Sequence, residues 1–140
     1  MSQLLDSIKA EEGSKVVGGR HVVYPDSLGL ETCGYGRLLS RGFSQDEAEL
    51  MLANDLAVAR AAASQYSWFA GLSQNRQDAV VDMIFNIGPT RFAGFVDLIA
   101  ALTSGSYSTA AAEMLDSRWH VQVGKRAERL ARIMASGVWE

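Results

Sequence analysis

Cysteine and histidine are scarce in this sequence. Cys33 is the single cysteine, so no internal disulfide can form, and a lone thiol fits synthesis in a reducing cytoplasm. Together with His21 and His120 it supplies too few soft ligands, at unsuitable spacings, for a zinc site. We therefore expect neither a metal nor a cofactor.

Long apolar runs are also missing. The most apolar stretch, near Phe95–Leu102, is interrupted by Asp97, so no segment is expected to span or insert into a bilayer. The first residues show neither the basic nor the apolar region of a signal peptide. We expect the chain to be made in the cytoplasm without such a signal.

A basic stripe of the kind that binds nucleic acid is absent. Residues 1–43 balance five basic against five acidic side chains, residues 44–115 carry three against eight, and residues 116–140 carry five against three. The net charge is −3, with its acidic excess in the middle of the chain. This distribution argues against a nucleic-acid partner, and the basic tail is interpreted as solvated surface charge.

The bulk composition is that of one globular domain. The 140 residues include 48% hydrophobic and 21% charged side chains, enough to bury a substantial core without disulfides. The first segment is expected to be a helix capped by Ser2, with Leu5, Ile8 and Glu12 along one face and a stop at Gly13.

Short strands follow that helix. Residues 15–17 and 20–24 flank Gly18-Gly19 as in a hairpin, residues 24–29 form a proline–glycine turn, and residues 30–36 are expected to form another strand.

The rest of the chain is predicted to be helical. Ser44 and Glu47 form a capping box at the start of a long helix that reaches about Tyr66. Further helices are expected at residues 75–87, 95–103, 109–115 and 125–135. The fold class is therefore α+β, with a small β lobe after one helix and a long helix that bridges it to a helical lobe.

Glu12 and Asp26 are candidate catalytic carboxyl groups. Glu12 lies on the apolar line of its helix and at the negative end of the helix dipole, so partial burial would favour its protonated form as a proton donor. Its neighbour Glu11 lies about 100° around the helix and is expected to be solvated. Asp26, in a hydrated turn, is expected to stay ionised. Thr32 supplies a hydroxyl on the next strand, on the opposite face from Cys33.

Each of these residues also has an ordinary structural interpretation. A helix-end glutamate commonly faces solvent, a turn aspartate bonds its own backbone, and a strand threonine is a β-former. Two carboxyl groups in contrasting surroundings, with a hydroxyl near the second, are nevertheless typical of the catalytic groups of a glycosidase.

The order of these residues resembles the T4-type lysozymes, the endolysins of phages. Their pattern is Glu-Gly, a short strand, and then Tyr-x-Asp-x-x-Gly-x-x-Thr-x-Gly-x-Gly. Residues 12–13 supply the Glu-Gly, and residues 24–36 match the Tyr-to-Gly segment in both type and spacing. Residues 82–88, 92–95, 117–119, 126–129 and 137–139 are similar to later segments of that family. The resemblance thus extends over nearly the whole chain.

The resemblance implies a bilobed lysozyme fold in a single domain. Its small lobe covers about residues 12–43, its bridging helix about 44–66, and its helical lobe about 67–140 with the N-terminal helix packed on it. The resemblance makes Glu12 the general acid and implies that Asp26 and Thr32 position and activate the attacking water. The remaining implied site residues are Leu38, Phe85 and Asn86 as sugar contacts and Arg126 as the basic residue that faces the glutamate.

The activity implied is hydrolysis of the β-1,4 link between N-acetylmuramic acid and N-acetylglucosamine in bacterial peptidoglycan, by inversion. We expect a monomer that acts on the cell wall in the periplasm, with a holin as partner if it serves phage lysis.

Two departures from the family pattern stand out. The chain between Glu12 and Asp26 is longer, with the extra residues centred on Gly18-Gly19-Arg20-His21. Because loop length costs little closure entropy, we expect this hairpin to be peripheral to the chemistry. Arg37 stands where the family usually has histidine, which puts a local polar pairing in doubt.

Three alternatives stay open. Cys33 with His21 or His120 would form a cysteine peptidase, although strand alternation places Cys33 away from Thr32 and in the small lobe's core. A lytic transglycosylase needs the acid but no fixed water. A non-catalytic glycan-binding protein is expected to lose the acid or the water-binding pair, and this chain has all three residues.

Overall fold

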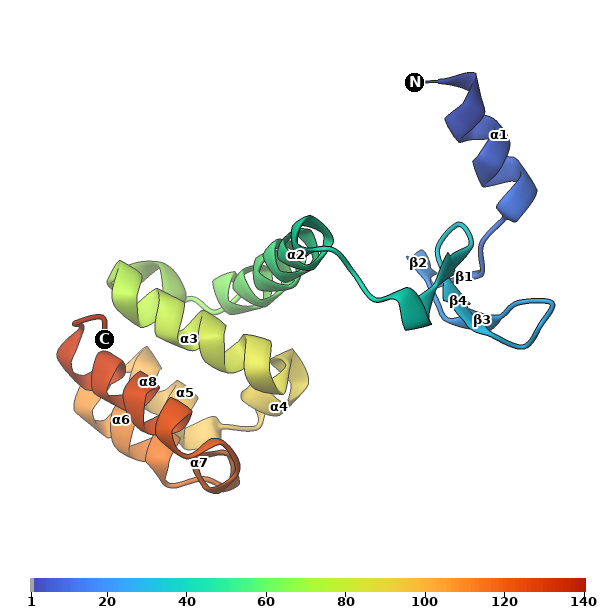
Figure 1. Cartoon of the computed structure of the whole chain (residues 1–140). Coiled ribbons are helices and arrows are strands. Elements are labelled where there is room, and N and C mark those ends of the chain that lie inside the picture. Colours follow the sequence, from blue (N-terminus) through green and yellow to red (C-terminus); the bar gives the residue numbers. More distant parts are fainter. Residues whose placement is uncertain (1) are drawn as a thin grey trace. The chain divides into compact units, whose positions relative to one another are not determined.

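The computed structural model describes residues 2–140, which form two compact units. Within the described residues the first unit ends at Ala48, and the second comprises Glu49–Glu140. The long helix α2 (Gln45–Ser64) begins in the first unit and continues in the second. Figure 1 follows the chain through both units.

The first unit begins with the helix α1 (Gln3–Glu12). Ser2 caps it as expected, since the Leu5 amide donates to Ser2 Oγ at 3.3 Å. Gly13 ends the helix with a positive φ of 62°, which an L side chain would resist, and its amide donates to the Lys9 carbonyl.

Five short strands follow α1. A two-stranded hairpin pairs β1 (Val16–Val17) with β2 (Arg20–His21), and Gly18 and Gly19 turn between them with φ of 57° and 75°. A three-stranded antiparallel sheet has the order β3 (Tyr24–Pro25), β4 (Glu31–Cys33), β5 (Arg37–Leu38). A 3₁₀ turn, η1 (Leu39–Arg41), leads to α2.

The strands are shorter than the sequence predicts. The single strand expected over residues 20–24 is divided between β2 and β3, which belong to different sheets. The strand expected over residues 30–36 ends at Cys33, because Gly34 and Gly36 take positive φ values and turn the chain into β5.

The second unit is helical. It contains the rest of α2, a 3₁₀ turn η2 (Phe69–Gly71), and the helices α3 (Gln74–Ile87), α4 (Pro89–Ala93), α5 (Val96–Thr103), α6 (Tyr107–Leu115), α7 (Arg118–Val123) and α8 (Lys125–Ser136). The helices α4 and α7 were not predicted. Gly88-Pro89 is a stop signal for α3, but proline also fits the first turn of a new helix, and Ser117 caps α7.

The core of the second unit lies where α3, α6 and α7 pack against α8 and α5 packs against α6 (Figure 1). Its fully buried large side chains are Met83, Ile84, Phe92, Leu98, Met114, Leu130, Ile133 and Met134. The second unit, which includes the predicted helical lobe, therefore has a hydrophobic core of its own. The packing of α1 on that lobe stays a prediction.

Candidate active site

Glu12 is the last residue of α1, and its carboxylate lies against the turn between β4 and β5. A Cβ atom built on Gly36 would stand only 2.7 Å from Glu12 Oε2 and 3.2 Å from its Cδ. Glycine allows this approach without a shift of the carboxylate, and Gly36 also has a φ of 77°, which an L side chain would resist. The Glu-Gly and Gly-x-Gly parts of the sequence motif therefore meet in the folded first unit.

The two adjacent glutamates of α1 have different surroundings. Glu11 Oε1 accepts a hydrogen bond from Ser7 Oγ at 3.1 Å within the helix, whereas the Glu12 carboxylate lies at Gly36. Within the first unit Glu12 is exposed, so the partial burial expected from the sequence is not found there. The reason is local: Gly13 ends the helix directly after Glu12, and α1 buries no side chain.

Asp26 organises the turn between β3 and β4. Its Oδ1 accepts the Leu28 and Leu30 amides, each at 2.8 Å, and its own amide donates to the Leu30 carbonyl at 2.9 Å. This is the Asx turn expected of an aspartate beside proline and glycine. Both bonds use Oδ1, and no hydrogen bond to Oδ2 is seen within residues 2–140.

Thr32 is the buried polar side chain of the small sheet, with 3% of its surface exposed. It stands in the central strand β4, between Tyr24 of β3 and Leu38 of β5. Its Oγ1 donates to the Leu30 carbonyl at 3.0 Å, which leaves the hydroxyl oxygen able to accept. The backbone of Leu30 thus binds the side chains of both Asp26 and Thr32.

The alternation along β4 corrects one expectation. Thr32 and Cys33 do face opposite ways, but the buried side chain is Thr32, while Cys33 is half-buried. The sequence pattern gives the alternation but not which face the neighbouring strands cover. The Cys33 thiol donates to the His21 carbonyl at 3.6 Å, and within residues 2–140 it bonds to no histidine ring. This contact does not support a cysteine–histidine nucleophile.

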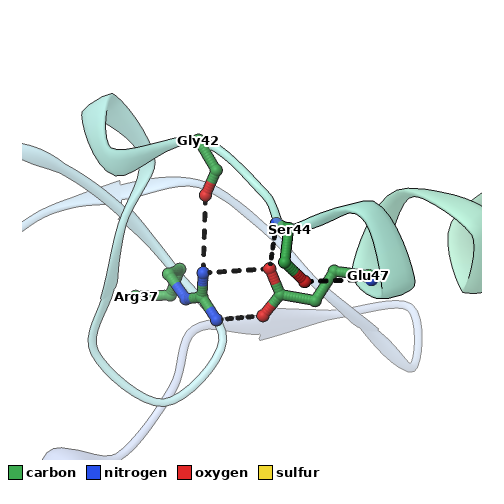
Figure 2. A network of polar contacts seen from close by, with 4 residues as sticks. All are labelled: Arg37, Gly42, Ser44 and Glu47. Atoms are coloured by element: carbon green, nitrogen blue, oxygen red, sulfur yellow. Dashed lines mark hydrogen bonds and ion pairs between the residues drawn. The ribbon is translucent and has the colours of Figure 1, made fainter.

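Arg37, at the usual histidine position, forms a network with the start of α2 (Figure 2). Its guanidinium spans both carboxylate oxygens of Glu47, with Nη1 at 3.2 Å from Oε2, and also donates to the Gly42 carbonyl at 3.4 Å. The Ser44 amide donates to Glu47 Oε2 at 2.8 Å, and the Glu47 amide to Ser44 Oγ at 3.2 Å. The capping box is therefore confirmed. The Ser44 amide, and then Arg37, lower the pKa of Glu47 from its ordinary value of 4.5.

The remaining sequence-predicted site residues belong to the second unit. Asn86 Oδ1 accepts the Trp119 Nε1 hydrogen bond at 2.8 Å, which fixes the orientation of its amide. Arg126 donates twice to Asp82 Oδ1, from Nε at 2.8 Å and from Nη2 at 2.6 Å. Arg129 binds the other oxygen of Asp82 at 3.2 Å.

A groove of about 710 Å³ lies in the second unit and brings Phe85 and Arg126 together. Trp139, which was not predicted as a site residue, lines the same groove. The full lining is Leu52, Ala53, Leu56, Ala57, Arg60, Asp78, Val81, Asp82, Phe85, Arg126 and Trp139. Leu38, in contrast, belongs to the first unit beside Thr32.

Over residues 2–140 no group of three or more histidine, cysteine, aspartate or glutamate side chains is arranged to hold a metal ion. Over the same residues, every helix is too short or too polar to cross a membrane.

Comparison with known proteins identifies the same family as the motif. The model of the phage lysozyme family matches residues 14–133, beginning just after Glu12. The probable T4-type lysozymes 2 and 1 of Dictyostelium discoideum are 23% and 22% identical, each over 98% of this chain and 96% of theirs. An endolysin of Acyrthosiphon pisum secondary endosymbiont phage 1 is 35% identical over 70% of this chain and 68% of its own.

The α+β architecture, the motif residues and these matches agree. The chain belongs to the phage lysozyme family and is a glycoside hydrolase of the lysozyme type.

Proposed function

We propose that the enzyme is an N-acetylmuramidase that cleaves the β-1,4 bond between N-acetylmuramic acid and N-acetylglucosamine in bacterial peptidoglycan by a single inverting displacement. The observation that carries this proposal is the joint anchoring of Asp26 and Thr32 on the backbone of Leu30. One side chain offers a carboxylate oxygen and the other a hydroxyl, which together suit a bound water.

In the proposed reaction Glu12 donates its proton to the glycosidic oxygen as the bond from that oxygen to the sugar C1 breaks. Water oriented by Asp26 and Thr32 attacks C1 from the opposite face and gives its proton to Asp26. The products are a free 4-hydroxyl and a new reducing end with the α configuration. An aspartate that acts through water does not form a covalent bond to the sugar.

Leu38, Phe85 and Asn86 are proposed as glycan contacts. Phe85 is 38% exposed and offers a flat apolar surface, and the amide of Asn86 is oriented by Trp119. Arg126 is proposed as a supporting residue. Its guanidinium donates two hydrogen bonds to Asp82, which orient it. The biological setting we propose is phage lysis of a host cell wall by a monomeric enzyme, with a holin giving access to the periplasm.

The decisive experiment follows the products released from purified peptidoglycan by proton NMR during early turnover. We expect the α-anomer of the new reducing end to appear first. The β-anomer appearing first would contradict the inverting mechanism, and a 1,6-anhydro product would identify a lytic transglycosylase.

The water-binding role of Thr32 can be tested with a matched pair of variants. Thr32→Val removes the hydroxyl, so turnover should fall while glycan binding changes little. Thr32→Ser keeps the hydroxyl and should retain most of the turnover. Full activity of Thr32→Val would leave this threonine as an ordinary strand residue.

A further inference from the structure

The inserted hairpin carries His21, which contacts the segment that follows Glu12. His21 Nδ1 and Ser14 Oγ are hydrogen-bonded at 2.5 Å. Ser14 comes directly after Gly13, the residue that ends α1. The imidazole therefore holds the chain at the point where it leaves the helix that presents Glu12.

The same imidazole also contacts the segment on which the Glu12 carboxylate rests. Its ring meets the Tyr35 ring edge-on, with centroids 5.2 Å apart and planes at 65°. Tyr35 directly precedes Gly36, whose backbone lies against Glu12. From α1, Lys9 Nζ lies 5.8 Å from the centre of the Tyr35 ring.

A third contact fixes the backbone of His21 itself. The Cys33 thiol donates to the His21 carbonyl at 3.6 Å, which ties β2 to β4. His21 is thus joined to three segments, and the first two are the supports of one carboxylate. It is an exposed residue that buries little apolar surface, so its contacts should affect position more than stability.

We propose that His21 is a positioning residue for Glu12. It links Ser14, after the glutamate, to Tyr35, before Gly36, and so keeps the carboxylate aimed at the reacting bond. This inference rests on the proposed role of Glu12 as the acid. It replaces the expectation that the inserted hairpin is peripheral to the chemistry.

Three variants separate the contacts of the imidazole. His21→Phe keeps a ring against Tyr35 but removes the nitrogen, and Ser14→Ala removes the same hydrogen bond from the other side. His21→Asn restores a polar atom near the position of Nδ1. Arg20→Gln is the matched control, because Arg20 precedes His21 in β2 and its side chain makes no ion pair or hydrogen bond within residues 2–140.

The measurements are kcat and KM on purified peptidoglycan, together with the thermal unfolding midpoint of each variant. We expect His21→Phe and Ser14→Ala each to lower kcat about tenfold with little change in KM, since small displacements of a catalytic group have effects of this size or larger. The double variant should be no worse than either single one, because both remove one bond. His21→Asn should recover most of the kcat, and Arg20→Gln should match the wild type.

Several results would overturn the inference. A wild-type kcat in His21→Phe would do so, as would a rise in KM alone, which would make His21 a sugar contact. A loss of kcat explained by partial unfolding at the assay temperature would make it a structural residue. Glu12→Gln is assayed alongside: if it stays active, the proposed function itself fails, whereas an inactive Glu12→Gln beside a fully active His21→Phe removes this inference alone.

Discussion

Glu11 and Glu12 are neighbours in the sequence, yet the fold gives their carboxylates separate surroundings. Glu11 is bonded by Ser7 one helical turn earlier, while Glu12 lies over the backbone of Gly36. Two identical side chains at the end of one helix therefore provide an internal control for the proposed acid.

Replacing Glu12 by glutamine should nearly abolish lysis of peptidoglycan while the protein stays folded. The amide keeps the shape of the side chain but cannot donate the proton, and general acid catalysis contributes roughly a hundred- to ten-thousand-fold. Turbidity loss of a cell-wall suspension measures the effect, and circular dichroism checks the fold. Glu11→Gln should be mild by comparison, so the reverse order would show that the acid has been assigned to the wrong glutamate.

Gly36→Ala should reduce activity beyond its effect on stability. The added Cβ would stand 2.7 Å from Glu12 Oε2, so the carboxylate must move. Gly34→Ala is the matched control, because Gly34 also has a positive φ, 61°, but a Cβ there meets nothing within 4 Å. Each variant should lose about 1–2 kcal/mol of folding free energy through backbone strain.

Denaturant unfolding and kcat on peptidoglycan, measured for both glycine variants, separate the two effects. Only Gly36→Ala should lose kcat after the comparison is made at equal folded fraction. Equal activity of the two alanine variants would mean that the contact with Gly36 does not fix the Glu12 carboxylate.

At the scale of elements, the start of α2 is a junction where side chains connect a helix to the small sheet. Ser44 and Glu47 cap each other's backbone amides, and Arg37 of β5 joins the Glu47 carboxylate to the small sheet. A capping device that ordinarily serves one helix therefore also connects that helix to a strand.

Ser44→Ala should destabilise the protein by about 1 kcal/mol, because the Glu47 amide loses its side-chain acceptor. The first amides of α2 should then exchange faster with solvent in hydrogen-exchange NMR. Ser40→Ala is the control, since Ser40 is exposed in η1 and its side chain makes no hydrogen bond within residues 2–140. Unchanged exchange at the start of α2 would show that Arg37 and Glu47 hold this end without the serine.

At the scale of the whole molecule, stability should depend on pH through a few surface pairs. The pKa of Glu47 is lowered by the Ser44 amide and Arg37, and that of Glu140 by a hydrogen bond from Arg132. The hydrogen bond with Glu128, followed by the Leu115 carbonyl, raises the pKa of His120 above its ordinary value of 6.5.

Because these pKa shifts have opposite signs, the carboxyl groups lose their stabilising contribution at low pH and His120 loses its contribution at high pH. The lowered carboxyl pKa values contribute stability above the unfolded value of 4.5, which is lost as the pH falls through the folded values. The raised His120 pKa contributes stability below 6.5, which is lost as the pH rises through the folded value. Because all three groups are at the surface, the contributions should be small.

The His120 contribution can be isolated by scanning the unfolding temperature of the wild type and of His120→Gln from about pH 6 to about pH 8. The wild type should lose a small extra amount of stability over this range, and the variant should not. Glu128→Gln should flatten the profile in the same way, since it removes the partner. Parallel profiles for all three proteins would mean that the pair contributes nothing measurable.

The sequence by itself determined where most helices begin and end and which residues carry the motif. Ser2, Ser44 and Gly13 act on backbone groups close to them in the chain, so their effects can be predicted from the sequence. The same local logic predicted the Gly18-Gly19 hairpin and the Asx turn of Asp26. It failed where a signal has two uses, as at Gly88-Pro89, which ends one helix and starts the next.

Only the tertiary structure decided which of these residues meet. Glu12 contacts Gly36, and Arg37 pairs with Glu47, although each pair is separated along the chain. The structure likewise decided that Thr32 rather than Cys33 is buried. Such contacts depend on how turns direct the strands and on which face of a strand its neighbours cover. Periodicity fixes the alternation of side chains, but it takes the assembled sheet to choose the buried face.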